Sequence, residues 1–264
     1  MQLTADQLKR FHEDGFLILP NLFSKAEVAA LTGALPRLFA EDTPANFREK
    51  ASGVVRTAMG LHQRDETYAR VVRHPRLVEP AMQILGDDQL YIMQVKVNVK
   101  AAFGGEVWQW HYDFATHHGA DGVPKPLPLN LHILLDDVSE FNGPLWFIRG
   151  SHRHGPAPSR LDTVTTSYPL WIVDNADVAR LAEEGGIVAA HGGAGTVLIF
   201  GDTLVHGSPP NMSPWNRRIF SLILNPVSNA GRAERRPDWQ HHRDLSAVVP
   251  LADDCLLAPA QAAE

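Results

Sequence analysis

The sequence predicts a mainly β fold with flanking α-helices, a double-stranded β-helix (jelly roll) of the cupin type. From Leu90 onward, polar residues alternate with apolar ones in a period of two, which is typical of a strand with one face toward a core. Later apolar runs are short and are separated by glycine, proline and asparagine turns. Two sheets of such short strands make a jelly roll. The later strands are expected at 129–135, 145–148, 196–200 and 219–224.

The first part of the chain, about 1–88, is expected to form a helical buttress beside the sheets. Thr4 can cap a helix over 5–14, because its side chain can accept a hydrogen bond from a free backbone N–H of the first turn. Gly15 ends that helix. A short apolar strand over 16–19 follows it.

Two further helices are predicted in this buttress. Ser24 and Glu27 have the spacing of a capping box, and apolar residues at helical spacing follow them. A third helix is expected over 75–85, where a glycine follows the last apolar residue. The polar stretch 42–64 between these helices is expected to be loop, with one exposed strand around 53–59.

The remaining chain is expected to complete one domain over 1–264, because 264 residues that are 44% hydrophobic support one substantial core. The β-core is placed at about 89–230. Within it, an insert over about 160–195 is predicted to contain a helix and is expected to shape the substrate entrance, as variable loops often do. A C-terminal tail covers about 231–264.

Composition excludes several classes of partner. The formal net charge of -6 and the pI near 6.1 provide no bulk attraction to nucleic acid or anionic membranes. No apolar run approaches the ~20 residues of a membrane span, and no segment resembles a signal peptide. The single cysteine, Cys255, excludes an intramolecular disulfide framework. We therefore expect a cytoplasmic protein, a monomer or homodimer, whose partner is a small molecule.

A candidate metal site is the most informative motif. His111 and Asp113 are two residues apart in a strand-like run, so their side chains would project to one face while Tyr112 points away. A third candidate ligand, His206, follows far downstream. Two histidines and one carboxylate form the facial triad that leaves positions on non-haem Fe(II) open for a cosubstrate and oxygen. The spacing alone also fits a core histidine beside a turn aspartate.

The segment after His206 supplies a second indication. A loop rich in turn formers leads to a buried strand that opens with Arg217 and Arg218. An arginine that enters a buried strand needs a partner, and its planar guanidinium binds a carboxylate through two parallel hydrogen bonds. A dicarboxylate cosubstrate would supply that partner. Because the two arginines point to opposite faces of the strand, only one of them can enter a pocket.

On these residues the chain resembles the phytanoyl-CoA dioxygenase (PhyH) family of Fe(II)/2-oxoglutarate oxygenases. The family pattern is an HxD pair, a distal histidine and an arginine eleven residues beyond it, here His111, Asp113, His206 and Arg217. Within the family the chain is most similar to ectoine hydroxylases and free L-leucine hydroxylases. The further shared residues run across most of the chain: Gln94, Lys96, Asn98, 103–105, 110–114, Asp121, Gly122, Pro124, 142–144, 150–152, Asn225, Val227 and Asn229.

The resemblance implies a set of site residues. Fe(II) would be held by His111, Asp113 and His206, with 2-oxoglutarate and O2 as the other reactants. The implied contacts to the cosubstrate come from Arg217, Ser208, Asn130, Gln94, Asn98 and Trp108. The implied contacts to the substrate come from His117, Phe114, Gln94 and Val123. Asn130 stands where the family often has serine or threonine. His117 stands where ectoine hydroxylases have an aromatic residue, which argues against ectoine itself.

Other histidines are expected to have other roles. His117 and His118 lie in the expected loop after the metal pair and would line the pocket or face solvent. His132 alternates within an apolar strand and would be a core residue that is hydrogen-bonded to a neighbour. His152 fits a structural turn as well as a substrate contact, and the pair at 241–242 is expected to be solvated.

The implied reaction is hydroxylation of an aliphatic carbon of a small zwitterion, a free L-amino acid or derivative, with release of succinate and CO2. Halogenating relatives lack the carboxylate ligand, so Asp113 favours hydroxylation. Three alternatives stay open at this point. The substrate could be a CoA thioester or a natural-product intermediate, the reaction could be desaturation or epimerisation, or the chain could be a non-enzymatic cupin-like binding protein. The last of these would not need Arg217.

Overall fold

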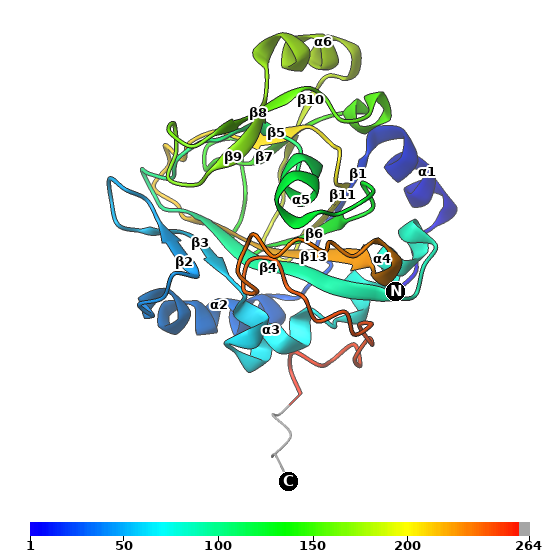
Figure 1. Ribbon diagram of the computed structural model, residues 1–264. Coiled ribbons are helices and arrows are strands. Elements are labelled where there is room, and N and C mark those ends of the chain that lie inside the picture. Colours follow the sequence, from blue (N-terminus) through cyan, green and yellow to red (C-terminus); the bar gives the residue numbers. More distant parts are fainter. Residues whose placement is uncertain (259–264) are drawn as a thin grey trace.

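Two antiparallel sheets lie against each other in the structure, a computed structural model that describes residues 1–258 (Figure 1). The seven-stranded sheet contains, in spatial order, β1 Phe16–Leu19, β11 Val197–Gly201, β6 Leu129–Leu134, β13 Arg217–Pro226, β4 Leu90–Lys100, β3 Val55–Met59 and β2 Asn46–Arg48. The four-stranded sheet contains β10 Ile187–Ala190, β7 Leu145–Ile148, β12 His206–Ser208 and β5 Trp108–His111. A separate pair contains β8 Ser159–Asp162 and β9 Leu170–Val173. The predicted jelly roll is confirmed.

The first two helices begin as their sequence predicts. α1 spans Ala5–Asp14 and α2 spans Lys25–Ala40, and a complete capping box precedes each one. The side chains of Thr4 and Ser24 accept hydrogen bonds from backbone N–H groups in the first turn, which have no partner within the helix. Gly15 ends α1 in the left-handed region, with φ of 87°.

Three of the helices cover the outer face of the seven-stranded sheet. Figure 1 shows α2 and α3, which spans Glu66–Val71, beneath the sheet, and α4, which spans Pro75–Leu85, at its edge. Their apolar side chains join those of the outer sheet face in one buried cluster: Leu31, Leu35, Tyr68, Leu77, Val95, Val97, Phe220 and Leu222. Because this cluster fills the outer face, the polar residues that alternate with it along β4 must face the other sheet.

The inner face of this sheet therefore carries rows of polar side chains. The register pairs Lys96 on β4 with Ser221 on β13, and Ser221 with His132 on β6. The row beside it joins Gln94, Ile223 and Asn130 across the same strands. The alternation seen in the sequence thus becomes a polar surface between the two sheets.

The stretch 42–64 differs from its prediction. It contains two strands instead of one, and each residue of β3 is buried instead of exposed. Arg56 on β3 donates hydrogen bonds to Glu106 and to the Val107 carbonyl, and its guanidinium lies 4.0 Å from the centre of the Trp108 ring. The Arg56 guanidinium can be buried here because residues that are distant in sequence bind it, and the local sequence pattern does not reveal these partners.

The insert and the tail both pack onto the rest of the protein. The insert contains β8, β9 and α6 Asn175–Gly185, so its predicted helix is present. In the described part of the tail, Val248, Cys255 and Leu256 belong to the core cluster on the outer sheet face. The tail therefore contributes to the core as well as to the surface.

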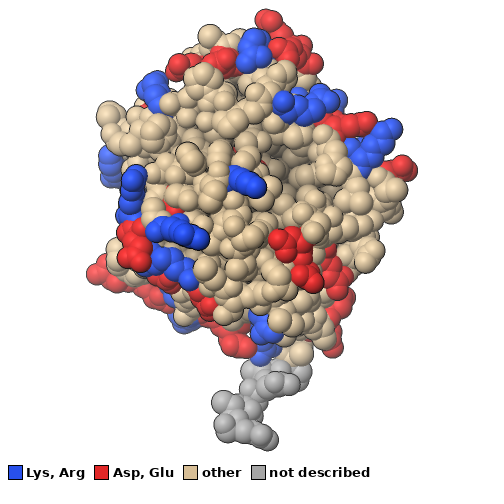
Figure 2. All heavy atoms as spheres, turned by 45° about the vertical axis from the view of Figure 1, so that its right-hand side comes forward, with Lys and Arg blue, Asp and Glu red and all other residues tan. Residues whose placement is uncertain are grey.

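The helices and one face of the surface can be described in terms of length, polarity and charge. No helix within residues 1–258 is both long and apolar enough to cross a membrane. On the face seen in Figure 2, acidic and basic side chains are interspersed around the periphery, and no broad patch of one sign is present on this face. Nothing on this face indicates a binding site for a polyanion.

We predict opposite effects for two glycine-to-alanine substitutions. Gly195 has a φ of 92°, and an added Cβ would lie 2.1 Å from the Phe23 carbonyl oxygen. Gly195→Ala should therefore lower the free energy of unfolding by about 1–3 kcal/mol or more. Gly33 lies inside α2 with nothing within 4 Å of an added Cβ, so Gly33→Ala should raise it by about 0.5–1 kcal/mol. Urea unfolding measures both, and shifts in the same direction would contradict this account.

Candidate active site

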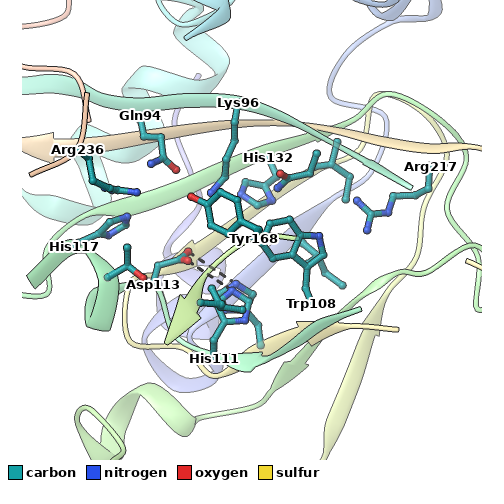
Figure 3. A pocket seen from close by; sticks show the side chains of 16 residues that line it. Gln94, Lys96, Trp108, His111, Asp113, His117, His132, Tyr168, Arg217 and Arg236 are labelled. Atoms are coloured by element: carbon teal, nitrogen blue, oxygen red, sulfur yellow. Dashed lines mark ion pairs between the residues drawn. The ribbon is translucent and has the colours of Figure 1, made fainter. Parts of the chain in front are cut away.

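A pocket between the two sheets contains most of the predicted site residues (Figure 3). The seven-stranded sheet supplies residues of β4, β6 and β13, and the smaller sheet supplies residues of β5, β7 and β12. The lining is mixed in polarity: Gln94, Lys96, Asn98, Trp108, His111, Asp113, Thr116, His117, His132, Leu145, Tyr168, Leu170, His206, Arg217, Ile219 and Arg236.

His111, Asp113 and His206 meet at one side of this pocket. The pairing of β12 with β5 places His206 directly opposite His111. The Nε2 atoms of these histidines lie 3.7 Å (His111) and 3.9 Å (His206) from the Asp113 carboxylate oxygens. One ligand atom from each residue lies within 4.8 Å of the others, which makes the group a candidate metal site.

Backbone carbonyls fix both imidazole rings. Nδ1 of His111 lies 2.6 Å from the Gln109 carbonyl oxygen, and Nδ1 of His206 lies 2.9 Å from that of Leu204. Since a carbonyl only accepts, each Nδ1 carries the proton and donates. Each Nε2 is then left with its lone pair toward the carboxylate. Hydrogen bonds of this kind orient the histidine ligands of metal sites.

The protonation states also suit a metal. Burial lowers the pKa of His111 to about 3, and the neighbouring His206 adds to this effect. Burial likewise lowers the pKa of His206. For Asp113, burial acts to raise the pKa, but the opposing effects of His206 and Lys96 hold it well below its usual value. Both imidazoles are therefore neutral and the carboxyl group is ionised, which is the form in which these groups bind metals.

The local structure around Asp113 differs from the predicted strand. β5 ends at His111, and Asp113 occupies the N-cap position of α5, which spans Phe114–Asp121. The Asp113 side chain makes no capping hydrogen bond. Its carboxylate therefore stays available to the two histidines. His117 and His118, predicted in a loop, lie in this helix.

Arg217 lies at another end of the pocket and has no anionic partner there. Its side chain is 1% exposed, and it donates to the Gly143 carbonyl oxygen at 3.0 Å and to the Ser208 hydroxyl at 3.1 Å. Among the described residues, no carboxylate lies within ion-pair distance of it. Burial lowers the pKa of Arg217 to about 9. Arg218 instead donates to both carboxylate oxygens of Asp136, outside the pocket lining.

Of the other residues predicted to contact the cosubstrate, some line the pocket and one does not. Trp108, Asn98 and Gln94 line the pocket. Asn98 accepts a hydrogen bond from Thr57, and Gln94 donates to the Gln240 carbonyl.

Asn130 is different. It is fully buried beside the pocket but outside its lining, and its amide has no hydrogen-bond partner among the described residues.

Of the residues predicted to contact the substrate, two line the pocket and two lie outside its lining. His117 lines the pocket, and so does Gln94. Phe114 and Val123 lie outside the lining and pack in a buried cluster with Tyr91 and Met93. Phe114 turns away because it follows Asp113 at the start of a helix rather than continuing a strand.

His117 is held by a buried ion pair. Its Nδ1 lies 2.8 Å from Oδ1 of Asp202, and the two side chains are 3% and 0% exposed. Burial opposes the charged imidazolium, but the Asp202 carboxylate raises the pKa of His117 above its usual value. The backbone carbonyl of Asp202 also accepts from the N–H of Phe114. Asp202 therefore ties α5, which begins beside Asp113, to the loop that precedes His206.

Among the lining residues that sequence reasoning missed are three polar ones that come from separate segments. Thr116 lies in α5, Tyr168 in the insert and Arg236 in the tail. Arg236 donates from Nε to Asp121 at 2.7 Å and from Nη2 to the second oxygen of that fully buried carboxylate. The only available signal was weak, namely that Arg235 and Arg236 form a basic pair in an otherwise uninformative tail.

Two other histidines lie in environments that the sequence predicted only in part or wrongly. His132 bonds to the Ser221 hydroxyl at 2.9 Å, as expected of a core residue, and its ring also lines the pocket. His241 was predicted to be solvated, but it is 1% exposed and lies 3.5 Å from Asp121. That prediction is wrong because the tail folds back over the pocket end.

Residues 11–219 match the profile of the family described as Phytanoyl-CoA dioxygenase (PhyH). The chain belongs to this family. An ectoine dioxygenase of Bordetella bronchiseptica is 38% identical over 239 residues, which cover 86% of this chain and 77% of the relative. An L-proline trans-4-hydroxylase of Streptomyces griseoviridis is 35% identical over 261 residues, 95% of this chain and 97% of the relative. The predicted family and the dioxygenase class are thereby confirmed.

Solved structures agree with the sequence relatives. The crystal structure of EctD from S. alaskensis with 2-oxoglutarate and 5-hydroxyectoine matches with a TM-score of 0.83 at 33% identity, over 94% of this chain and 87% of that chain. The same protein with bound Fe matches with a TM-score of 0.82 at 32% identity, over 95% and 87% of the two chains.

We predict that the His117–Asp202 pair stabilises the fold around the site. Asp202→Ala removes one partner of a buried pair and should lower the free energy of unfolding by ~3–5 kcal/mol. Asp202→Asn can still accept the hydrogen bond from Nδ1 and should cost clearly less. Urea unfolding of the three proteins tests this. Equal losses in the two variants would mean that the hydrogen bond to His117 is not the source of the stability.

Proposed function

We propose that the chain is an Fe(II)- and 2-oxoglutarate-dependent dioxygenase that hydroxylates an aliphatic carbon of a small zwitterion. The substrate is a free L-amino acid or a close derivative. The observation that carries this proposal is the presence of a His-Asp-His group, whose histidines are buried, and an arginine without an anionic partner among the described residues in one pocket. The first suits iron, and the second suits the far carboxylate of a dicarboxylic cosubstrate.

The residues fit Fe(II) in number and kind. Two neutral imidazoles and one carboxylate, His111, His206 and Asp113, would occupy one face of the ion and leave the other face open. Bound Fe(II) and 2-oxoglutarate supply the oxidative chemistry, in which O2 is consumed, succinate and CO2 are released and one oxygen atom enters a C–H bond. The protein orients the reactants and keeps bulk water from the reacting atoms.

The end of the pocket around Arg217 suits the cosubstrate. Arg217 and Ser208 share the Gly143 carbonyl as an acceptor, so the two donors are held side by side. Arg217 would bind the far carboxylate of 2-oxoglutarate through its remaining N–H groups, and Ser208 would bind it by turning its hydroxyl proton from the Gly143 carbonyl to that carboxylate. Trp108 and Asn98 would form the adjacent wall. Asn130 lies one layer deeper, and we assign it a supporting role there.

The opposite end of the pocket suits a small zwitterion. Figure 3 shows Gln94, His117 and Arg236 together at this end, and Thr116 and the apolar Leu170 also line the pocket. A zwitterion needs partners for both charged ends, because burial of either charge without a partner is costly. Relatives named for ectoine and L-proline support this class, since both molecules are small zwitterions. Phe114 and Val123 would act only behind this wall.

Hydroxylation is favoured over halogenation because Asp113 occupies the position that a halide would need. A turnover screen tests the substrate class. Free L-amino acids, ectoine, a CoA thioester and natural-product intermediates are incubated with Fe(II) and 2-oxoglutarate, and products are read by mass together with succinate. One added oxygen on an amino acid supports the proposal, whereas conversion of the thioester alone, or loss of two hydrogens, contradicts it. A cytoplasmic location and a monomeric or homodimeric state belong to the same proposal.

Loss of any triad residue should abolish turnover and weaken metal binding. His111→Ala, Asp113→Ala and His206→Ala each remove one of the three protein ligands, so no remaining group can replace it. Anaerobic titration of the metal-free protein with Co(II) measures affinity apart from activity. His118→Ala is the control, because His118 is exposed on the same helix and lies outside the pocket lining. Near-normal affinity in any triad variant would remove that residue from the site.

Arg217→Ala should raise the Michaelis constant for 2-oxoglutarate at least about tenfold. Loss of one partner of a buried charge pair typically costs ~2–5 kcal/mol. Arg218→Ala should leave this constant within about twofold, because Arg218 binds Asp136 outside the pocket. Steady-state kinetics with varied 2-oxoglutarate compares the two variants. If Arg218→Ala had the larger effect, the cosubstrate would bind at the other face of β13.

A further inference from the structure

Three cationic side chains line the pocket, and only one of them is neutralised within the protein. Arg236 binds both oxygens of the buried Asp121 carboxylate. Arg217 has only a carbonyl and a hydroxyl as partners. For Lys96, the described residues provide neither a hydrogen bond nor an ion pair to the ammonium group. Two positive charges are thus left for ligands.

The position of Lys96 is set by the sheet. It lies between Gln94 and Asn98 on the inner face of β4, and the register places it opposite Ser221, whose hydroxyl bonds to His132. Figure 3 shows its side chain reaching from β4 toward the triad, between Arg236 on one side and Arg217 on the other. It is also among the groups that lower the pKa of Asp113, which agrees with a location above the triad.

The formal charges of the proposed ligands leave Lys96 uncompensated. Divalent iron and the Asp113 carboxylate together carry one positive charge, and Arg217 adds another. The two negative charges of 2-oxoglutarate balance these. Lys96 therefore remains as an unpaired cation in a pocket that substrate would close to water, where an unpaired charge is costly. A further anionic group is needed beside the Lys96 ammonium, and the carboxylate of the substrate is the remaining one.

We propose that Lys96 binds the carboxylate of the substrate and that this contact selects carboxylic acids over their neutral analogues. The inference rests on the proposed function and names the substrate group that its pocket recognises. Gln94 complements Lys96, because its amide nitrogen already donates to the Gln240 carbonyl and its oxygen is left as an acceptor for the substrate amine. The two residues lie on one face of β4 and would hold the two ends of a zwitterion.

The test compares an acid with its amide. The probes are the amino acid that the unmodified enzyme converts best and its carboxamide, L-proline and L-prolinamide if proline is that amino acid. The unmodified enzyme should prefer the acid by about tenfold to a hundredfold in kcat/KM, as expected for one charge-assisted contact. Lys96→Met should reduce this preference to about threefold or less by raising the KM of the acid alone. Lys96→Arg keeps the charge and should retain most of the preference.

Two further measurements separate this role from others. The KM for 2-oxoglutarate and the Co(II) affinity should stay within about twofold in Lys96→Met, because neither ligand depends on Lys96. Calorimetric binding of the acid to the zinc-loaded protein should weaken in parallel with the kinetic effect. Thermal unfolding checks the fold, and Lys96→Gln serves as a second neutral variant if Lys96→Met is unstable.

Several results would overturn the proposal. A rise in the KM for 2-oxoglutarate with an unchanged acid preference would assign Lys96 to the cosubstrate. Loss of the preference in Arg236→Gln, but not in Lys96→Met, would assign the carboxylate to Arg236 instead. Failure of the proposed function is a different result, since the unmodified enzyme would then form no iron-dependent succinate with any compound of the screen.

Discussion

The antiparallel pairing of β5 with β12 is the interaction on which the rest of the site depends. It brings His111 opposite His206, although the two lie far apart in the chain. Carbonyls two residues before each histidine, those of Gln109 and Leu204, orient the rings, whose centres lie 4.1 Å apart. A register shift of one residue would turn one imidazole to the other face of the sheet. The candidate metal site is thus specified by strand pairing as much as by the identity of its candidate ligands.

The two faces of the seven-stranded sheet have different roles: the outer face forms the core, and the inner face lines the pocket. The outer face packs against α2, α3 and α4 in an apolar cluster, so the inner face is free to carry polar groups. Charged side chains that lie outside this sheet are neutralised within the protein, as in Arg236 of the tail with Asp121 and His117 of α5 with Asp202, and these pairs hold the pocket walls. Arg217 lacks such a partner. This difference separates the charges that build the pocket wall from the charge that we propose to bind the cosubstrate.

Features that depend on neighbouring residues could be predicted from the sequence. Both capping boxes, the helix over 75–85 and the alternation along β4 follow from local hydrogen bonding and from the period of the chain, and the structure contains all of them. The candidate ligands could also be found, because the spacing of His111, Asp113, His206 and Arg217 is a property of the sequence itself.

Only the tertiary structure decided which residues surround those ligands. The buried β3, the start of α5 at Asp113 and the burial of His241 all depend on distant segments that cover them. Tyr168 and Arg236 reach the pocket from the insert and the tail, whose sequences give no periodic signal for it. The sequence by itself determined the fold class, the candidate ligand set and the candidate cosubstrate arginine, since these follow from local spacing. The pocket walls were decided by the burial of polar groups, which depends on partners that are remote along the chain.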